Sequence, residues 1–391
     1  MTKPVRVLQI IDTLGMGGAE TWLMEVLRHW SGRGEAQMDF LATSGQRGLF
    51  DEEAAALGAT VHYIPYSRRN LPAFSRAFRR LLAEQQYDAI HDHQDYSSGW
   101  HFLLGAGRLP PVRVTHVHNP AYQIRNNYGV SAMRRATGRI GQALVARFTT
   151  NITGTSREVI GEYGFDGAAF ARIPRAAVYC GFDPARFAAL DRKLERSALL
   201  TEFHWPADSI VALFAGRIDR SPDAGDPQSH KNAGVGVNVA IAAAKLDARF
   251  RALFAGAPSP ATPVLEQRIA DHGLSDRIRL IGLRTDLAQL MTAADALLFP
   301  SRGEGLGMVA VEAQAAGLPV LASTAVPREC VVVPGMVRFK DLREGPSAWA
   351  AELLATAKQP RRTDANDFVA ASSFAIGRSA DALLALYRGQ G

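Results

Sequence analysis

Two glutamates stand in a stretch of sequence where a glycine-rich loop runs into an apolar, helix-prone segment, SRGEGLGMVAVEAQAAGLPV at 301–320. Glu304 lies in the loop, and Glu312 lies inside the segment that follows, with seven residues between them. An ionised carboxylate only accepts hydrogen bonds, so two of them at one site suit a ligand that carries several hydroxyl groups. The spacing therefore raises the question of what would lie between the two acids.

The glycines between the glutamates favour a loop followed by a helix. Gly305 and Gly307 leave the backbone free to turn, and the apolar run predicts a helix that begins near Met308. The free amide groups of Leu306, Gly307 and Met308 would then form an anion site at the positive end of the helix. Helix side chains tilt toward the N-terminus, so Glu312 would reach back toward that site. A nucleotide sugar has this layout of ribose, diphosphate and sugar.

A second glycine loop, TLGMGGAET at 13–21, follows a strand-like segment and precedes a helical pattern. Such a loop presents free N–H groups to an anion. A dinucleotide-binding fingerprint would need a glycine at position 20, counted from Gly15 and Gly17, but Glu20 stands there. This weakens an NAD-binding interpretation without excluding it, and a tight turn with no ligand is the structural alternative.

A pair of basic residues surrounds a polar insertion in the second half of the chain. The strand-like segment LFAGRID at 213–219 contains Gly216 and Arg217, and Lys231 follows the insertion 220–229. Arginine can hold a phosphate through two hydrogen bonds and lysine as a point charge. Together they could bind a diphosphate at one strand end.

The run IHDHQD at 90–95 has the composition of a metal site, with His91, Asp92, His93 and Asp95 at a predicted strand end. Alternate strand residues face opposite sides, so His91 and His93 share a face that Asp92 does not. The interpretations favoured over a metal are an acceptor-facing strand end or partly buried, hydrogen-bonded histidines. We expect no metal.

Short apolar runs alternate with helical patterns in both halves of the chain, which is typical of parallel α/β sheets. The sequence predicts two doubly wound, Rossmann-like domains that face each other across a cleft, with ligands at the carboxyl ends of the strands. We expect domains at 1–180 and 181–372 and a final helix at 373–391 that returns to the first domain. The predicted strands of the first half are 5–11, 38–43, 60–64, 88–93, 112–118 and 151–156, and those of the second are 209–216, 251–256, 277–282, 296–301 and 318–323.

Composition and charge narrow the class of protein further. The chain has 391 residues, is 47% hydrophobic and contains two cysteines, Cys180 and Cys330, which suits a reducing compartment. It has no apolar run long enough to span a membrane and does not begin with a signal-peptide pattern, so we expect a cytoplasmic protein.

The basic residues are concentrated in the first half. The net charge is +6, and the segment 96–157 contains arginines but no aspartate or glutamate. Such a face suits nucleic acid, anionic lipid or a phosphorylated substrate, unless it is only solvated. Within it, 130–148 can form a helix that carries Arg134, Arg135 and Arg139 beside apolar residues, as a membrane-surface helix would, although an ordinary helix packed on the sheet has the same pattern.

Taken together, these motifs resemble a retaining glycosyltransferase of family 4 with the GT-B architecture. The likeness rests on the two glutamates, on Gly216 and Arg217 followed by Lys231, and on the GGAE loop that starts at Gly17. The run GLPVLASTAVPRECVVVPGMVRFKDLREGPSAWA resembles the branch that builds exopolysaccharide and capsule chains. The likeness extends from residue 5 to about residue 388. The family usually reaches the lysine within a few residues, so the insertion departs from its pattern.

The resemblance implies roles for individual residues. Glu304 and His118 would be catalytic, with Glu304 beside the transferred sugar and Glu312 on the ribose of the donor. Arg217 and Lys231 would hold the diphosphate. The other donor-binding residues would be Gly17, Gly18, Gly216, Arg284, Gly305, Leu306, Gly307 and Met308, and those on the acceptor side would be His93, Asp95 and Asn119.

The function that the resemblance implies is transfer of a sugar from a nucleoside diphosphate, with UDP expected, to a lipid-linked saccharide. The reaction would retain the anomeric configuration and need no metal and no cofactor other than the nucleotide sugar as co-substrate. We expect a protein peripheral to the inner face of the plasma membrane, attracted by anionic lipid, and no nucleic-acid partner. The alternatives are a nucleotide-sugar epimerase on the same scaffold and a non-catalytic nucleotide-sugar-binding protein.

Overall fold

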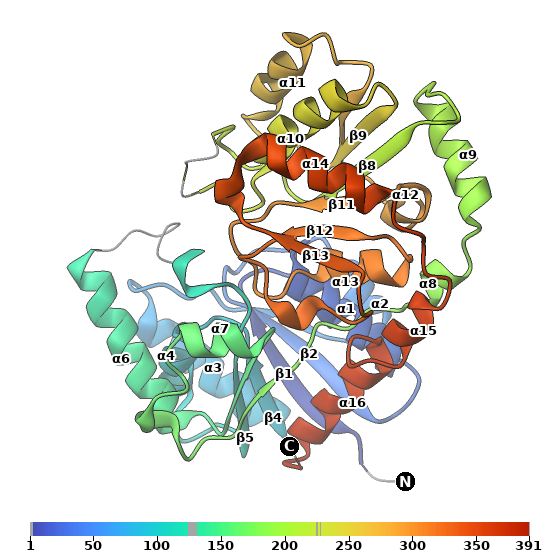
Figure 1. Ribbon diagram of the computed structural model, residues 1–391. Coiled ribbons are helices and arrows are strands. Elements are labelled where there is room, and N and C mark those ends of the chain that lie inside the picture. The colour runs from blue at the N-terminus through green and yellow to red at the C-terminus, as the bar shows by residue number, and fades with distance from the viewer. Residues whose placement is uncertain (1–2, 124–130, 224–225, 227, 391) are drawn as a thin grey trace. The chain divides into compact units, whose positions relative to one another are not determined.

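The computed structural model describes residues 3–123, 131–223, 226 and 228–390 (Figure 1). The chain divides into two compact units: unit 1 is Met1–Phe182 with Ser373–Gly391, and unit 2 is Asp183–Ser372. The sequence placed the first boundary after residue 180, whereas in the structure unit 1 continues to Phe182. The C-terminal segment belongs to unit 1.

Unit 1 is built on a parallel sheet, seven-stranded in the part of the chain that the structure describes. The strands of its interior are buried along most of their length, as parallel strands covered by helices must be, although residues such as Gln9, His91 and Asp92 interrupt their apolar runs. In sheet order they are β3 (Val61–Tyr63), β2 (Ala36–Ala42), β1 (Val5–Ile11), β4 (Ala89–Asp92), β5 (Val112–Val117), β6 (Asn151–Gly154) and β7 (Arg175–Ala177).

Helices of unit 1 connect these strands, and one more comes from the far end of the chain. The C-terminal helix, α16 (Ile376–Tyr387), packs against the first helix and against β1, as the red and blue ribbons of Figure 1 show. The connecting helices are α1 (Gly18–Trp30), α2 (Asp51–Ala56), α3 (Leu71–Gln85), α4 (Ser97–Gly105), α6 (Ala132–Phe148) and α7 (Arg157–Glu162), with a 3₁₀ turn at Ala168–Phe170.

Unit 2 repeats the plan with a parallel sheet that has six strands among its described residues. In sheet order they are β10 (Ile278–Gly282), β9 (Phe250–Ala255), β8 (Ile210–Ala215), β11 (Ala296–Phe299), β12 (Val320–Ser323) and β13 (Val337–Lys340). The α-helices are α8 (Ala185–Ala188), α9 (Arg192–Glu202), α10 (Ala233–Leu246), α11 (Thr262–Ala270), α12 (Leu287–Ala293), α13 (Met308–Ala315), α14 (Gly345–Ala357) and α15 (Ala365–Ala370), with 3₁₀ turns at Arg328–Cys330 and Leu342–Glu344.

Each sheet has one point where the strand order reverses direction. In unit 1 the reversal lies between β1 and β4, and in unit 2 between β8 and β11. The loops that leave two such neighbouring strands diverge to opposite faces, and the crevice between them is where open α/β sheets bind ligands. The predicted α/β architecture with two doubly wound units is confirmed.

None of the described helices carries an apolar stretch long enough to cross a bilayer. Both cysteines are buried as free thiols.

Candidate functional site

A lysine and a glutamate meet at the switch point of unit 2. Lys231 lies on the connection that leaves β8, and Glu304 lies on the loop that leaves the neighbouring strand β11. Lys231 Nζ lies 2.7 Å from Glu304 Oε1 and 3.0 Å from Oε2. Their side chains keep 29% and 11% of their surface exposed, so both groups remain open to solvent. The crevice thus contains a cation suited to phosphate and a carboxylate suited to sugar hydroxyls.

A buried aspartate explains how Lys231 reaches the strand end in spite of the insertion 220–229. The Asp219 carboxylate accepts hydrogen bonds from the backbone amides of Lys231 at 3.1 Å and of Ala233 at 3.3 Å. It therefore caps the start of α10 and closes the insertion into a loop. The longer spacing between Arg217 and Lys231 leaves the lysine at the end of β8.

The described part of the insertion is held against the loop that carries Glu304. Arg302 Nη1 donates to the carbonyl oxygen of Asp226 at 2.8 Å, and its backbone amide donates to that of His230 at 2.9 Å. Ser229 Oγ donates to the carbonyl of Ser221 at 3.2 Å. These bonds fasten the insertion beside the glutamate rather than leaving it apart from the site.

Gly216 and Arg217 directly follow β8. A Cβ atom on Gly256, at the end of β9, would collide with the carbonyl oxygen of Gly216, so the two strand ends approach as only glycine allows. Arg217 is exposed, and its guanidinium makes no hydrogen bond or ion pair with any residue that the structure describes. It remains available to an anion.

The helix α13 begins at Met308, as the sequence predicts, and Gly307 is the residue that starts it. Gly307 has a φ of 94°, and a Cβ there would lie 2.9 Å from Phe299 Cε1. Both the backbone conformation and the lack of space for a side chain therefore favour glycine. Leu306 is buried, and what it offers to a ligand is its backbone. Gly305 lies between it and Glu304 in the same loop.

Glu312 lies on α13 and has a partner of its own. Its Oε1 accepts a hydrogen bond of 2.6 Å from Arg186 Nη2 on α8. The two glutamates therefore pair with different cations, Glu304 with Lys231 and Glu312 with Arg186. Arg186 lies 126 positions from Glu312, and no motif in the sequence marks it as the partner.

The far end of α13 is anchored by a buried glutamine. Gln314 Nε2 donates to the carbonyl of Cys330 at 2.8 Å, and its Oε1 accepts from the amides of Val332 at 2.9 Å and Val333 at 2.8 Å. A buried side chain whose donors and acceptors are paired in this way fixes the backbone around it.

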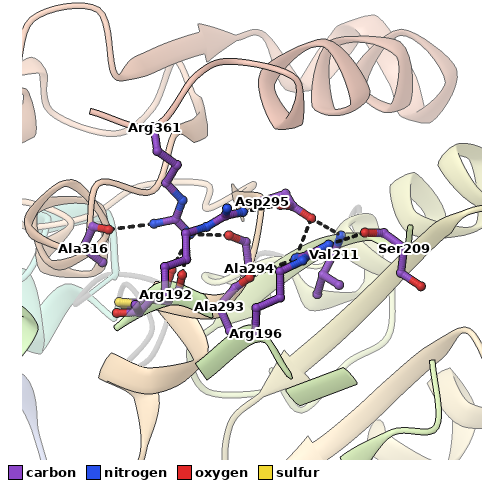
Figure 2. A network of polar contacts seen from close by, with 11 residues as sticks. Arg192, Arg196, Ser209, Val211, Ala293, Ala294, Asp295, Ala316 and Arg361 are labelled. Carbon is purple, nitrogen blue, oxygen red and sulfur yellow. Dashed lines mark hydrogen bonds and ion pairs between the residues drawn. The ribbon is translucent and has the colours of Figure 1, made fainter. Parts of the chain in front are cut away.

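Arg361 adds a second anchor, which Figure 2 shows from close by. Its Nη1 donates to the carbonyl of Ala316, directly after α13, at 2.6 Å. Burial lowers the pKa of Arg361 to about 9. Its Nη2 donates to three carbonyls at the end of α12, those of Met291 and Thr292, both at 2.9 Å, and that of Ala294. One guanidinium therefore joins the C-terminal end of α12 to the C-terminal end of α13. This contact fixes α13, whose N-terminal end lies at the switch point.

Arg284 differs from the other predicted donor-binding residues because its guanidinium is already occupied. It donates to Glu202 Oε1 at 2.6 Å and to Asp286 Oδ2 at 2.6 Å. These hydrogen bonds raise the pKa of Arg284. No contact among the described residues joins it to Lys231 or Glu304.

In unit 1 the predicted glycines form the start of α1. Gly17 precedes the first helical residue, Gly18. A Cβ on Gly17 would collide with the carboxylate of Glu20, which folds back over this helix start, whereas a Cβ on Gly18 would meet no atom within 4 Å. Burial raises the pKa of Glu20. A side chain at Gly17 would therefore displace the Glu20 carboxylate, whereas one at Gly18 would displace nothing.

Four histidines from β4 and β5 and the residues just after them form one cluster in unit 1. His93 Nδ1 lies 2.7 Å from His118 Nε2, and His91 Nε2 lies 3.0 Å from His116 Nδ1. The rings of His116 and His118 stack with centroids 4.1 Å apart. Burial lowers the pKa of all four, that of His118 to about 3, so the cluster is neutral at ordinary pH. The prediction that His91 and His93 share a strand face as hydrogen-bonded histidines is confirmed.

The acidic residues near this cluster behave differently from one another. Asp92 points to the opposite face of the sheet and binds His101 Nδ1 at 2.7 Å, with both side chains buried. Asp95 has a φ of 50°, and burial raises its pKa to about 7. Asn119 is exposed beside His118.

The cluster has the residue types of a metal site but not its free ligand atoms. Among the described residues, His91, His93 and His116 bring ring nitrogens within 4.8 Å of one another. Most of the nitrogens of these rings are already hydrogen-bonded, to each other, to His118, to Tyr387 or to Gln9; the exception is His116 Nε2, which is buried without a partner. A cation would have to break this network, and one unpaired nitrogen does not hold it.

Two family models match the chain. The Glycosyltransferase Family 4 model matches residues 16–186, and the Glycosyl transferases group 1 model matches residues 227–358. Together they take in the first glycine loop, the histidine cluster, Lys231 and both glutamates.

Relatives of known description agree with these models. The putative glycosyltransferase EpsF of Bacillus subtilis is 26% identical over 388 residues, which are 98% of this chain and 96% of the relative. The D-inositol 3-phosphate glycosyltransferase of Mycobacterium tuberculosis is 33% identical over 343 residues, 81% of this chain and 65% of the relative. This chain is a glycosyltransferase.

The fold of this glycosyltransferase has solved counterparts. The crystal structure of Anabaena HepE in complex with UDP-glucose superposes with a TM-score of 0.71 at 19% identity, covering 99% of this chain and 100% of the other. At that identity the likeness shows the fold, which is GT-B.

Proposed function

We propose that this glycosyltransferase transfers a sugar from UDP to a hydroxyl group of a lipid-linked saccharide, with retention of configuration and without a metal, in exopolysaccharide or capsule synthesis. The observation that carries the proposal is the Lys231–Glu304 pair at the switch point of unit 2, close in sequence to the start of α13. The UDP-glucose complex of HepE supports the choice of donor.

The donor would be held by charges that the chain already supplies. Arg217 and Lys231 would bind the diphosphate, and the amides at the start of α13 would add the positive end of a helix dipole. These groups stand where a divalent cation would otherwise neutralise the leaving group, which supports a metal-independent reaction. Glu312 would bind the ribose hydroxyls, in exchange for part of its contact with Arg186.

The chemical step would be a displacement on one face of the sugar. The bond between the anomeric carbon and the β-phosphate oxygen breaks, and the acceptor hydroxyl attacks from the same side. Its proton passes to the departing phosphate, so the products are UDP and a glycoside of unchanged configuration. Glu304 would stabilise the positive charge that develops on the sugar, and His118 would contact the sugar that is transferred.

The test is a panel of UDP-sugars incubated with the purified protein, with and without a lipid-linked saccharide extract and with excess chelator. We expect UDP release that needs the extract, a glycoside of retained configuration by NMR, and no loss of rate with chelator. A changed sugar epimer without any acceptor would establish the epimerase alternative, and tight UDP binding without turnover would establish the binding-protein alternative. Loss of activity in chelator that manganese restores would contradict metal independence.

The helix α6 supports the peripheral-membrane part of the proposal. Met133 and Ile140 on α6 leave 66% and 47% of their surface exposed, and Arg139 lies between them in sequence. Arg68 adds a further cation, because its Nη1 lies 3.4 Å from Met133 Sδ. Exposed apolar side chains among cations are what an anionic membrane surface attracts, at about 1 kcal/mol for each basic side chain.

Vesicle cosedimentation tests this surface. We expect binding to phosphatidylglycerol vesicles that weakens as salt rises and that drops when Arg134, Arg135 and Arg139 are changed to glutamate. A matched control changes Arg249, Arg343 and Arg362 of unit 2 to glutamate, which alters the net charge equally. Equal binding to neutral vesicles, or equal loss in the control, would remove α6 as the membrane contact.

A further inference from the structure

A continuous chain of hydrogen bonds links the C-terminal helix to the histidine cluster. Tyr387, in the last turn of α16, places its hydroxyl 2.6 Å from His91 Nδ1 and 3.0 Å from Gln9 Nε2. Gln9 lies on β1, and its other amide atom, Oε1, lies 2.9 Å from His93 Nε2. His93 Nδ1 then contacts His118 Nε2 at 2.7 Å. Tyr387 and Gln9 thus form the centre of a network with two arms, one that ends at His116 and one that ends at His118.

The number of protons in this network fixes their positions. Each histidine is neutral and carries one N–H, and a hydroxyl has one proton to donate. With Gln9 Nε2 donating to Tyr387, the hydroxyl must donate to His91 Nδ1, so the proton of His91 is on Nε2 and points at His116 Nδ1. In the other arm, Gln9 Oε1 accepts from His93 Nε2, so His93 Nδ1 accepts from His118 Nε2. All four histidines then carry their proton on Nε2.

The opposite arrangement needs the Gln9 amide turned over from its orientation in the structure, and it reverses every bond; in both arrangements His116 Nε2 has no partner among the described residues. If the Gln9 amide is turned over, Tyr387 donates to Gln9 Oε1 and accepts from His91, and all four histidines carry their proton on Nδ1. A mixture within one molecule would either place two acceptors or two donors against each other or leave the Tyr387 hydroxyl proton without an acceptor inside the core, which is unfavourable. The four histidines therefore share one tautomer and change tautomer together.

We propose that Tyr387 and Gln9 are positioning residues that hold His118 in the Nε2–H tautomer and so leave its Nδ1 bare. His118 is half-buried and ends the network, so Nδ1 is the atom that it can present outside the cluster as a hydrogen-bond acceptor. An acceptor there suits a sugar hydroxyl. This use of Nδ1 rests on the proposed function, whereas the shared tautomer does not.

The experiment measures the tautomers directly, by long-range ¹H–¹⁵N NMR on protein labelled at the histidine rings, with His118 assigned from its absence in His118→Gln. We expect the four cluster histidines of the wild type to be Nε2–H. In Tyr387→Phe the link between the arms is lost, and we expect His118 to become a mixture of tautomers. Gln9→Met breaks the same link from β1 and gives a second variant if the first folds poorly.

Tyr87→Phe is the matched control, because it removes a buried hydroxyl of unit 1 that binds Asp39 Oδ2 at 3.0 Å and does not belong to the network. It should leave all four tautomers unchanged. A wild type with mixed tautomers in the cluster, or a Tyr387→Phe variant with an unaltered set, would overturn the proposal.

Kinetics test the positioning role. Loss of one hydrogen-bond contact to the transferred sugar corresponds to a decrease of about threefold to tenfold in kcat/KM for Tyr387→Phe, with the affinity for UDP alone unchanged. An unchanged kcat/KM beside altered tautomers would overturn the positioning role. If the wild type transfers no sugar at all, the proposed function fails, and the NMR measurement still decides whether the network exists.

Discussion

Lys231 and Glu304 bind each other across the two strand ends at which the sheet of unit 2 reverses direction, with Lys231 Nζ 2.7 Å from Glu304 Oε1. Glu304→Gln should leave the lysine free for the diphosphate, so UDP affinity should hold while kcat falls on the order of 100-fold, because the carboxylate acts on charge that develops in the transition state. Glu344→Gln, in the surface pair with Lys340, is the control and should change neither quantity.

Glu312→Gln should show the reverse behaviour. A ribose contact is present in the ground state and the transition state alike, so its loss should weaken UDP binding by roughly tenfold and change kcat little. Calorimetric titration of UDP into this variant and into Glu304→Gln compares the two roles. A large loss of affinity confined to Glu304→Gln would reverse the assignment.

Gly307→Ala should disturb the start of α13. The change adds the strain of a φ of 94° to a Cβ contact of 2.9 Å with Phe299. Gly273→Ala is the control, because Gly273 has a φ of 66° with no atom within 4 Å of a Cβ, which leaves strain alone, on the order of 1 kcal/mol. We expect a lower Tm for both variants, a larger drop for Gly307→Ala, and weaker UDP binding in that variant only. Equal Tm values would contradict this.

Asp95 should make stability depend on pH. Burial raises the pKa of Asp95 from 3.8 to about 7. Between these values the folded protein keeps a proton that the unfolded chain has lost, so this group lowers the free energy of unfolding as pH rises from about 4 to about 7. The histidine cluster has the opposite effect below pH 6.5, where it raises the free energy of unfolding as pH rises, because folding lowers the pKa values of its members.

The Asp95→Asn variant isolates the contribution of Asp95, because the histidines contribute equally to the free energy of unfolding of the variant and of the wild type. Urea unfolding at pH 5 and pH 7.5 should show the variant gaining stability relative to the wild type at the higher pH. Each unit by which the pKa of Asp95 differs between the folded and unfolded states changes the free energy of unfolding by about 1.4 kcal/mol. A difference between the two proteins that is the same at both pH values would contradict the raised pKa.

Arg361 should resist conservative replacement. An ammonium group cannot reach four carbonyls around one guanidinium plane, so Arg361→Lys should destabilise unit 2 by about 2–4 kcal/mol, and Arg361→Met by a similar amount because the carbonyls lose their donors. Arg343→Lys, on an exposed surface pair, should leave stability nearly unchanged. The Arg361 prediction is wrong if Arg361→Lys has the same Tm as the wild type.

Most of the strands that the sequence predicted are buried in the sheets, because a continuous apolar run signals burial on both faces, although β3 and β10 were predicted and lie at sheet edges. Two strands were missed, β7 at Arg175–Ala177 and β13 at Val337–Lys340. Each lies at the edge of its sheet and has no fully buried residue. Both are short and lack the continuous apolar run of a buried strand, so pairing with the neighbouring strand is what defines them.

In the candidate site, features that depend on adjacent residues could be predicted from the sequence, whereas contacts between distant residues could not. The start of α13 at Met308 could be predicted because glycines and apolar residues adjoin in the sequence. The partners of the site could not, because Arg186 is 126 positions from Glu312, and Tyr387 is 296 positions from His91. The polar Gln9 within an otherwise apolar strand, and the alternation of His116 and His118, were signals that could have pointed to the network.

The return of α16 to unit 1 sets an order of events during synthesis on the ribosome. Gln9 and Tyr387 are 378 positions apart, and Trp22 Nε1 binds Ser379 Oγ at 2.9 Å, so the surface of α1 and β1 is covered only after α16 has been made. At about 5–20 residues per second, that wait lasts roughly twenty seconds to a little over a minute. Unit 2 is a continuous stretch of chain and can fold in the meantime. Unit 1 is therefore begun before unit 2 and completed after it, and its open apolar face is a natural substrate for chaperones that act on nascent chains.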